Sequence, residues 1–233
     1  MAHNDVTAET YATRAHQALR SGNYLLCYDL VDQAQQLGHR NRRLQYLSLL
    51  ALANAGSTAF AWRVYRELGL RDEELDEDWL ALQGRLLKDL ALAGGGRAEY
   101  QAAAQAYLAA FRQTGGYFTA INAATMFLLA GETAASQELA REVLSLAGGT
   151  VPADDTDHYF LRASEAEAAL LLGEAARCRR SLQAADALAR GIAALGNAEN
   201  ESWGIEFGYR YDGVEGDPVT YQPTTAPGAR LPS

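Results

Sequence analysis

The side chains that could perform acid–base or metal chemistry are few and scattered in this sequence. The four histidines stand at positions 3, 16, 39 and 158, and only His158 has a carboxylate beside it, that of Asp157. Glu165 and Glu167 lie two residues apart, which places them on different faces of a helix, so one helix cannot use them together as acid and base. The sequence has no GxSxG, P-loop, HExxH or GxGxxG pattern. We therefore expect no catalytic residue, no metal site and no cofactor, and we interpret the protein as a non-enzyme.

The two cysteines, Cys27 and Cys178, have no CxxC or Cys/His neighbourhood, which disfavours a zinc site or a disulfide framework. A reducing cytoplasm is the expected compartment. No apolar run reaches the ~18–20 residues of a membrane-spanning helix, and the N-terminus lacks the basic start and hydrophobic core of a signal peptide. With 29 acidic against 20 basic residues, the net charge of −9 disfavours nucleic acid and membrane surfaces as partners. Basic or neutral partners fit better.

Regularly placed turns indicate how the chain is organised. Long apolar-periodic runs rich in Ala and Leu predict an all-helical fold, and four short turns centred on Gly22, Gly56, Gly131 and Gly173 separate these runs. A glycine at such a place ends one helix in a left-handed conformation and lets the next begin. Five residues after each glycine stands a small side chain, which indicates close crossing of two helices: Cys27, Ala61, Ser136 and Cys178.

The repeated unit is a helical hairpin, and the chain is expected to contain about five of them. The first helices should begin near residues 7, 41, 76, 117 and 156, at intervals close to the ~34 residues typical of tetratricopeptide repeats. The fold class is therefore all-α, a tetratricopeptide-like α-solenoid occupying residues 1–196. The expected helix pairs are 7–20 with 24–37, 41–55 with 57–68, 76–93 with 97–113, 117–130 with 132–147, and 156–172 with 174–190.

Three helix starts carry a side-chain oxygen that can accept the free amides of a first turn: Thr7, Asp76 and Asp155. The acidic run at residues 71–78 has two interpretations. It is either an electrostatic docking patch or, as we favour, a solvated loop that leads acidic side chains into a helix N-terminus, where the helix dipole stabilises them.

Three stretches stand out from generic repeat sequence: LQGRLLKDLA at 82–91, GYFTAINAATMFLLAGE at 115–131 and DTDHYFLRASEAEAALLLGE at 155–174. In order and spacing they resemble the TRAF-binding regulatory region of the apoptosis signal-regulating kinases, which also occurs in bacterial multidomain signalling proteins. The resemblance covers roughly residues 8–190 and implies a regulatory module in signalling. Its matching positions are Gly84, Arg85, Lys88, Asp89, Tyr117, Ile121, Asn122, Ala123, Ala124, Thr125, Asp157, Tyr159, Ala163, Glu165, Ala166 and Glu167.

Asn122 lies in the middle of an otherwise apolar helix, and two interpretations stay open. It hydrogen-bonds a neighbouring repeat, through Arg85, Lys88 or Asp157, or it presents its amide to a ligand on the concave surface; we favour the first. The first helices of successive pairs line that surface in a solenoid. The candidate partner-binding residues on these helices are Arg85, Lys88, Asn122, Arg162 and Glu165, although local ion pairs of Arg85 with Asp89 and of Arg162 with Glu165 also explain their spacing.

The composition changes from about residue 199, where four of the five prolines gather. We expect residues 197–233 to form an extended or disordered tail. Two of its pieces, GYRYD and YQPTTAPGARLP, are similar to a stretch of flavin-dependent aromatic hydroxylases. The predicted function is a protein-interaction or regulatory scaffold that binds a protein or peptide in its groove. The alternatives are a ligand-sensing regulatory domain of an effector enzyme such as a nucleotide cyclase, and an accessory to a flavin hydroxylase.

Overall fold

The structure is a computed structural model that describes residues 7–71 and 75–195 of the chain. These residues form helices joined by short connections, and no strand occurs among them. The predicted tail at 197–233, its hydroxylase-like pieces and the domain boundary near 196 lie outside the described residues. The helices are α1 (Ala8–Arg20), α2 (Tyr24–Gln36), α3 (Arg42–Asn54), α4 (Thr58–Glu67), α5 (Glu77–Leu92), α6 (Arg97–Thr114), α7 (Tyr117–Leu129), α8 (Thr133–Gly149), α9 (Asp155–Leu171) and α10 (Ala175–Leu195).

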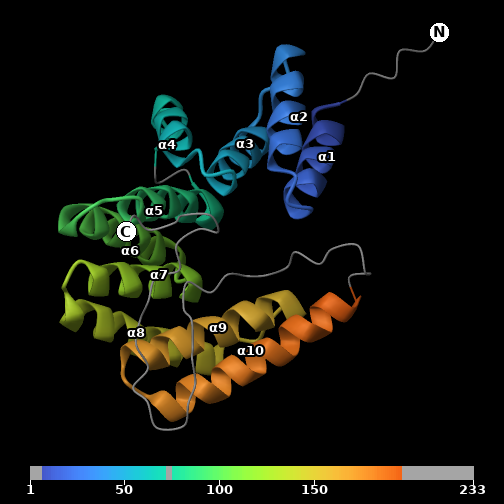
Figure 1. Cartoon of the computed structure of the whole chain (residues 1–233). Helices are drawn as coiled ribbons and strands as arrows, with labels where there is room; N and C mark the ends of the chain where they lie inside the picture. The colour runs from blue at the N-terminus through green and yellow to red at the C-terminus, as the bar shows by residue number, and fades with distance from the viewer. Residues whose placement is uncertain (1–6, 72–74, 196–233) are drawn as a thin grey trace, which may run out of the picture.

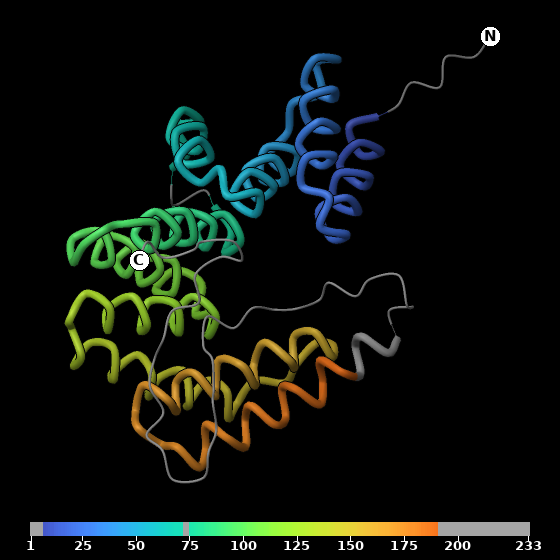
Figure 2. The backbone as a smooth tube through the Cα atoms, in the orientation of Figure 1, coloured from blue at the N-terminus to red at the C-terminus, as the bar shows by residue number. Residues whose placement is uncertain are grey.

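Consecutive helices pack against each other as hairpins, and the hairpins stack into an elongated, curved array (Figure 1). The predicted all-α solenoid is confirmed, and the helices agree with the five predicted pairs to within a few residues, apart from α10, which continues to Leu195. The tube in Figure 2 shows the chain advancing hairpin by hairpin from α1 to α10. None of the described helices combines the length and the apolar character needed to cross a membrane.

The four glycine corners have the geometry that the sequence predicts. Gly22, Gly56, Gly131 and Gly173 have φ angles of 73°, 78°, 79° and 75°, in the left-handed region that favours glycine. At the first corner the Gly22 amide donates to the Leu19 carbonyl and the next amide donates to the Ala18 carbonyl, and the other three corners repeat both bonds. This Schellman pattern satisfies carbonyls at the end of the helix and reverses the chain.

The small residues after these corners are core residues. Cys27 and Ala61 are 0% exposed, Ser136 is 1% and Cys178 is 3%. Both cysteines are free thiols, and burial raises the pKa of the Cys27 thiol to about 11. The predicted packing role of all four small residues is therefore confirmed.

Two of the three predicted caps are confirmed, and the third is displaced by one residue. The side chains of Thr7 and Asp76 accept the amides of Thr10 and Trp79. The prediction of Asp155 as the cap of α9 is wrong: Asp154 accepts the Asp157 amide at 2.8 Å. Asp154 has extended backbone angles suited to a cap, whereas Asp155 already belongs to the first turn of the helix.

Candidate functional site

Polar side chains join the first helices of neighbouring hairpins at intervals close to one repeat. The Lys88 ammonium on α5 donates to Oδ1 of Asn122 on α7 at 3.4 Å, across 34 residues of sequence. The Tyr117 hydroxyl on α7 donates to Oδ1 of Asp157 on α9 at 2.7 Å, across 40 residues. Further along α7, Thr125 donates to the Glu167 carboxylate of α9. The three stretches singled out in the sequence are thus in direct contact, which fixes the register of α5, α7 and α9.

A close contact with Tyr107 explains why the first of these stretches contains a glycine, Gly84, in the middle of a helix. A Cβ added at this position would lie 2.7 Å from two ring carbons of Tyr107 on α6. The Tyr107 ring is 1% exposed and belongs to the same core as Ile121 and Phe127 of α7. Because Gly84 has no side chain, the Tyr107 ring of α6 packs directly against the backbone of α5.

The N-terminus of α7 is covered by an acidic side chain. A Cβ on Gly116, the residue before the helix, would lie 1.8 Å from Oε1 of Glu77, so the carboxylate sits directly against this backbone. The same oxygen lies 3.4 Å from Oγ1 of Thr119. An anion at a helix N-terminus is favoured by the helix dipole. Glu77 comes from the predicted acidic run and stands with Asp78 in the first turn of α5, as the preferred interpretation of that run expects. Residues 72–74 of the run lie outside the described residues.

A pocket of about 690 Å³ opens on the side of the array formed by the first helices. Its walls come from α3, α5, α6, α7 and α9, so four consecutive hairpins contribute. Among the lining residues, the large apolar side chain of Phe118 is 43% exposed. The aromatic residues that line the pocket are Tyr46, Tyr107, Tyr117, Phe118 and Phe160.

The charged lining of the pocket is mixed and mainly acidic: Glu77, Asp78, Asp89, Asp157, Arg85 and Lys88. Burial lowers the pKa of the Lys88 ammonium, against the opposing effect of Asp89. Burial together with the nearby charge of Asp76 raises the pKa of Asp78. In the described residues no three His, Cys, Asp or Glu side chains are grouped as metal ligands.

Three of the five predicted site residues come together here. Arg85 and Lys88 line the pocket, and Asn122 lies next to it through its hydrogen bond from Lys88. The Asn122 side-chain amide also donates to the Phe118 carbonyl at 2.9 Å, so its oxygen and its NH2 group each make one hydrogen bond within the protein. The hydrogen bond to a neighbouring repeat that we favoured for Asn122 is present. The predicted pair of Arg85 with Asp89 is also present, with 3.6 Å between Nε and Oδ2.

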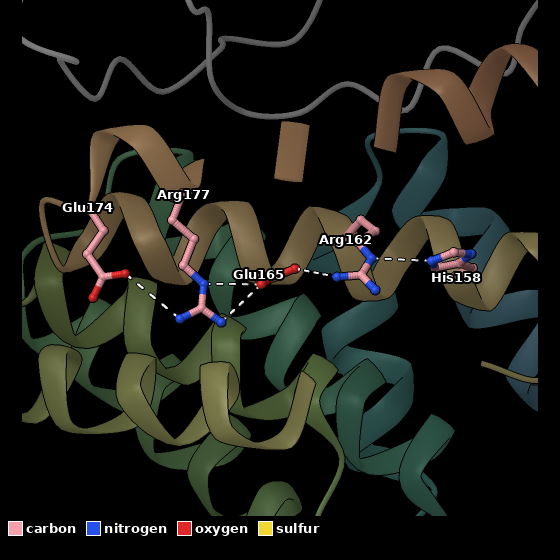
Figure 3. A network of polar contacts seen from close by, with 5 residues as sticks. All are labelled: His158, Arg162, Glu165, Glu174 and Arg177. Carbon is pink, nitrogen blue, oxygen red and sulfur yellow. Dashed lines mark hydrogen bonds and ion pairs between the residues drawn. The ribbon is translucent and has the colours of Figure 1, made fainter. Parts of the chain in front are cut away.

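Arg162 and Glu165 belong to a different arrangement, shown in Figure 3. Arg162 donates to Oε2 of Glu165 at 2.8 Å, and Arg177 on α10 donates twice to Oε1, at 3.1 and 3.0 Å. The Glu165 side chain is 11% exposed between the two guanidinium groups. This network joins α9 to α10, and neither Arg162 nor Glu165 lines the pocket. The expectation of a single patch of five residues is therefore corrected to two separate clusters.

Several pocket residues were not predicted as binding residues. Tyr46 precedes the recognised motifs, and Tyr107 comes from the second helix of its hairpin, which sequence reasoning assigned to the other face. The mid-helix glycine at position 84 was an available signal for Tyr107, because a glycine inside a helix often marks a close approach by a neighbour. Phe160 carried no comparable signal. Asp78 was covered only by the less favoured interpretation of the acidic run at 71–78 as an electrostatic docking patch.

The hairpins, the glycine corners and the polar contacts between first helices define a helical-repeat protein of the tetratricopeptide-like class. Comparison with family models agrees: the model described as Tetratricopeptide Repeats-Sensor matches residues 23–127. This range runs from the start of α2 into α7, so the α9 side of the pocket lies beyond it. Searches of curated proteins and of solved structures found no significant match.

Proposed function

We propose that the protein is a non-enzymatic regulatory module that binds a protein or peptide partner in the pocket lined by α3, α5, α7 and α9. The observation that carries this proposal is the pocket itself, because several helices of a solenoid contribute to it and partly exposed aromatic side chains line it, including Phe118, which is 43% exposed. Repeat proteins present such extended surfaces between consecutive units. Exposed aromatic side chains are enriched where partners bind.

The comparisons support the regulatory part of this proposal. The matching family is described as a sensor. Apart from the comparisons, the three stretches singled out in the sequence resemble, by their residue pattern alone, a regulatory region of signalling kinases. In this structure those stretches build the pocket walls or support them through hydrogen bonds. A regulatory module needs a surface whose occupancy can change, and the pocket supplies one.

A second candidate is a ligand-sensing regulatory domain that acts on an effector enzyme. The pocket volume favours it, because about 690 Å³ falls within the ~300–1,000 Å³ typical of small-molecule sites. A thermal-shift screen of small molecules against the full chain separates the two candidates. A saturable stabilisation by one compound class, abolished when the pocket is filled, would favour the ligand sensor.

The proposal is tested by filling the pocket. Ala81 lines it and is only partly buried, so Ala81→Trp should occupy the space without disturbing the core. The matched control is Ala109→Trp, at an exposed position of α6 that does not line the pocket. Affinity capture from the cells that encode the chain should recover a partner with wild type and with the control but lose it with Ala81→Trp. Equal recovery by all three proteins would refute the proposal.

A further inference from the structure

The charges in the pocket identify the chemistry of the partner, and this inference rests on the function proposed above. Four carboxylates and two cations line the pocket, so its formal charge is negative. The chain as a whole is also negative, with a net charge of −9. A concave site with an excess of one sign attracts ligands of the opposite sign.

The two cations of the pocket are already engaged with other side chains. Arg85 donates to Oδ1 of Asn54 on α3 and lies 3.6 Å from Asp89. Lys88 donates to Asn122. An anionic ligand would have to compete with these internal acceptors, so neither residue is an open anion site.

The helix N-terminus at the pocket is also occupied. The first residues of α7 would attract an anion through their free amides, but the Glu77 carboxylate lies against Gly116. The part of the pocket best suited to a phosphate or carboxylate is thus filled by the protein's own side chain.

Asp78 differs from the other pocket carboxylates. It has no hydrogen-bond or ion-pair partner in the described part of the chain, whereas Asp157 accepts from Tyr117 and Asp89 pairs with Arg85. Burial and the charge of another acid, Asp76, both disfavour its ionised form and raise its pKa. A cation placed beside Asp78 would relieve this unfavourable environment.

Aromatic rings accompany this acid in the lining of the pocket. Tyr46, Phe118 and Phe160 line the same pocket, and such rings attract a cation through their faces while packing against an aliphatic stem. Lysine and arginine side chains combine a cationic head with an apolar stem. We propose that the pocket binds a basic segment of a protein partner, which inserts a lysine or arginine side chain among these rings and beside Asp78.

A selection with random 12-residue peptides displayed on phage tests this proposal on the full-length protein. Peptides that bind wild type and the Ala109→Trp control, but not Ala81→Trp, are dependent on the pocket. The proposal expects these peptides to be enriched in Lys and Arg over the starting library. Enrichment in Asp and Glu, or in uncharged residues only, would overturn the basic-segment proposal while leaving the proposed function intact.

A failure to recover any pocket-dependent peptide would overturn the basic-segment proposal as well. The proposed function would then be decided separately, by whether Ala81→Trp abolishes capture of the cellular partner. The two ideas can therefore fail independently.

The selected peptide provides a second, residue-level test. Asp78→Asn should weaken its binding by about fivefold, as expected for loss of a solvent-accessible ion pair. Asp29→Asn is the matched control, because Asp29 is also exposed and unpaired in the described structure but lies on α2, outside the pocket. Acetylating the peptide's lysines should weaken binding to wild type more than to Asp78→Asn. Equal affinities for wild type, Asp78→Asn and Asp29→Asn, with folding verified by circular dichroism, would contradict the role of Asp78.

Discussion

The Tyr117 hydroxyl on α7 donates a hydrogen bond of 2.7 Å to the Asp157 carboxylate on α9. The other oxygen of this carboxylate accepts the Ala153 amide at 2.9 Å. Both hydrogen bonds lower the pKa of Asp157, with the backbone amide contributing the larger part. Because Tyr117 and Asp157 line the pocket, this bond also holds two of its walls together.

Tyr117→Phe removes the donor and leaves the ring in place. We expect the free energy of unfolding to fall by about 1.5 kcal/mol, the usual contribution of a hydrogen bond to a charged group in a partly buried site. Urea denaturation at pH 7 measures this loss. The control is Tyr100→Phe on α6, a partly buried tyrosine whose side-chain hydroxyl makes no hydrogen bond in the described structure. Similar stabilities for the two variants would contradict the assigned role.

Gly84→Ala tests the close contact between α5 and Tyr107. The added methyl group would lie 2.7 Å from a rigid ring, so we expect a loss of about 1–3 kcal/mol, as for other overpacked cores. Gly148→Ala is the matched control, because a Cβ at that helical position meets nothing within 4 Å. The control should be unchanged or gain up to ~1 kcal/mol from improved helix propensity. An equal effect of the two substitutions on the melting temperature would rule out the contact as the reason for the glycine.

The Glu165 network gives a pH-dependent prediction. Burial raises the pKa of Glu165, but hydrogen bonds from Arg177, Arg162 and Ser181 bring it below the ordinary value of 4.5. The unfolded chain therefore binds the proton more readily than the folded one, and stability increases with pH across this range. The stabilisation is fully present above pH 4.5 and is lost as the pH falls through the folded-state pKa.

Glu165→Gln should accordingly be less stable than wild type at pH 7, and the difference should shrink below pH 4.5. Denaturation curves of both proteins between pH 3 and 7 provide the comparison. Glu138→Gln, at an exposed acid of α8 outside any described ion pair, is the control. A stability difference for Glu165→Gln that stays constant over the whole range would contradict the account.

The fold was predictable because its determinants are local. The four glycine corners each end one helix and start the next within a few residues, and the small residues Cys27, Ala61, Ser136 and Cys178 mark where the paired helices cross. Both signals can be read along the sequence. The one displaced cap, Asp154 instead of Asp155, reflects a choice between adjacent acids that backbone geometry alone decides.

The site was only partly predictable because it depends on contacts between repeats. The motif positions at Lys88 and Asn122 were correctly placed near each other, since both lie on first helices. Sequence periodicity could not show that Glu165 meets Arg177 of the next helix, because Glu165 lies on a first helix like the true pocket residues. It also could not show that Tyr107 reaches the pocket from α6, which requires the space left by Gly84.

The central claim is that the partner occupies the pocket between α3, α5, α7 and α9. Hydrogen-exchange mass spectrometry of the full chain, with and without the captured partner, tests it most directly. We predict that the partner slows exchange in the peptides that contain residues 77–89, 116–118 and 157–160. Protection confined to α2, α4 and α8, with these segments unchanged, would contradict the claim.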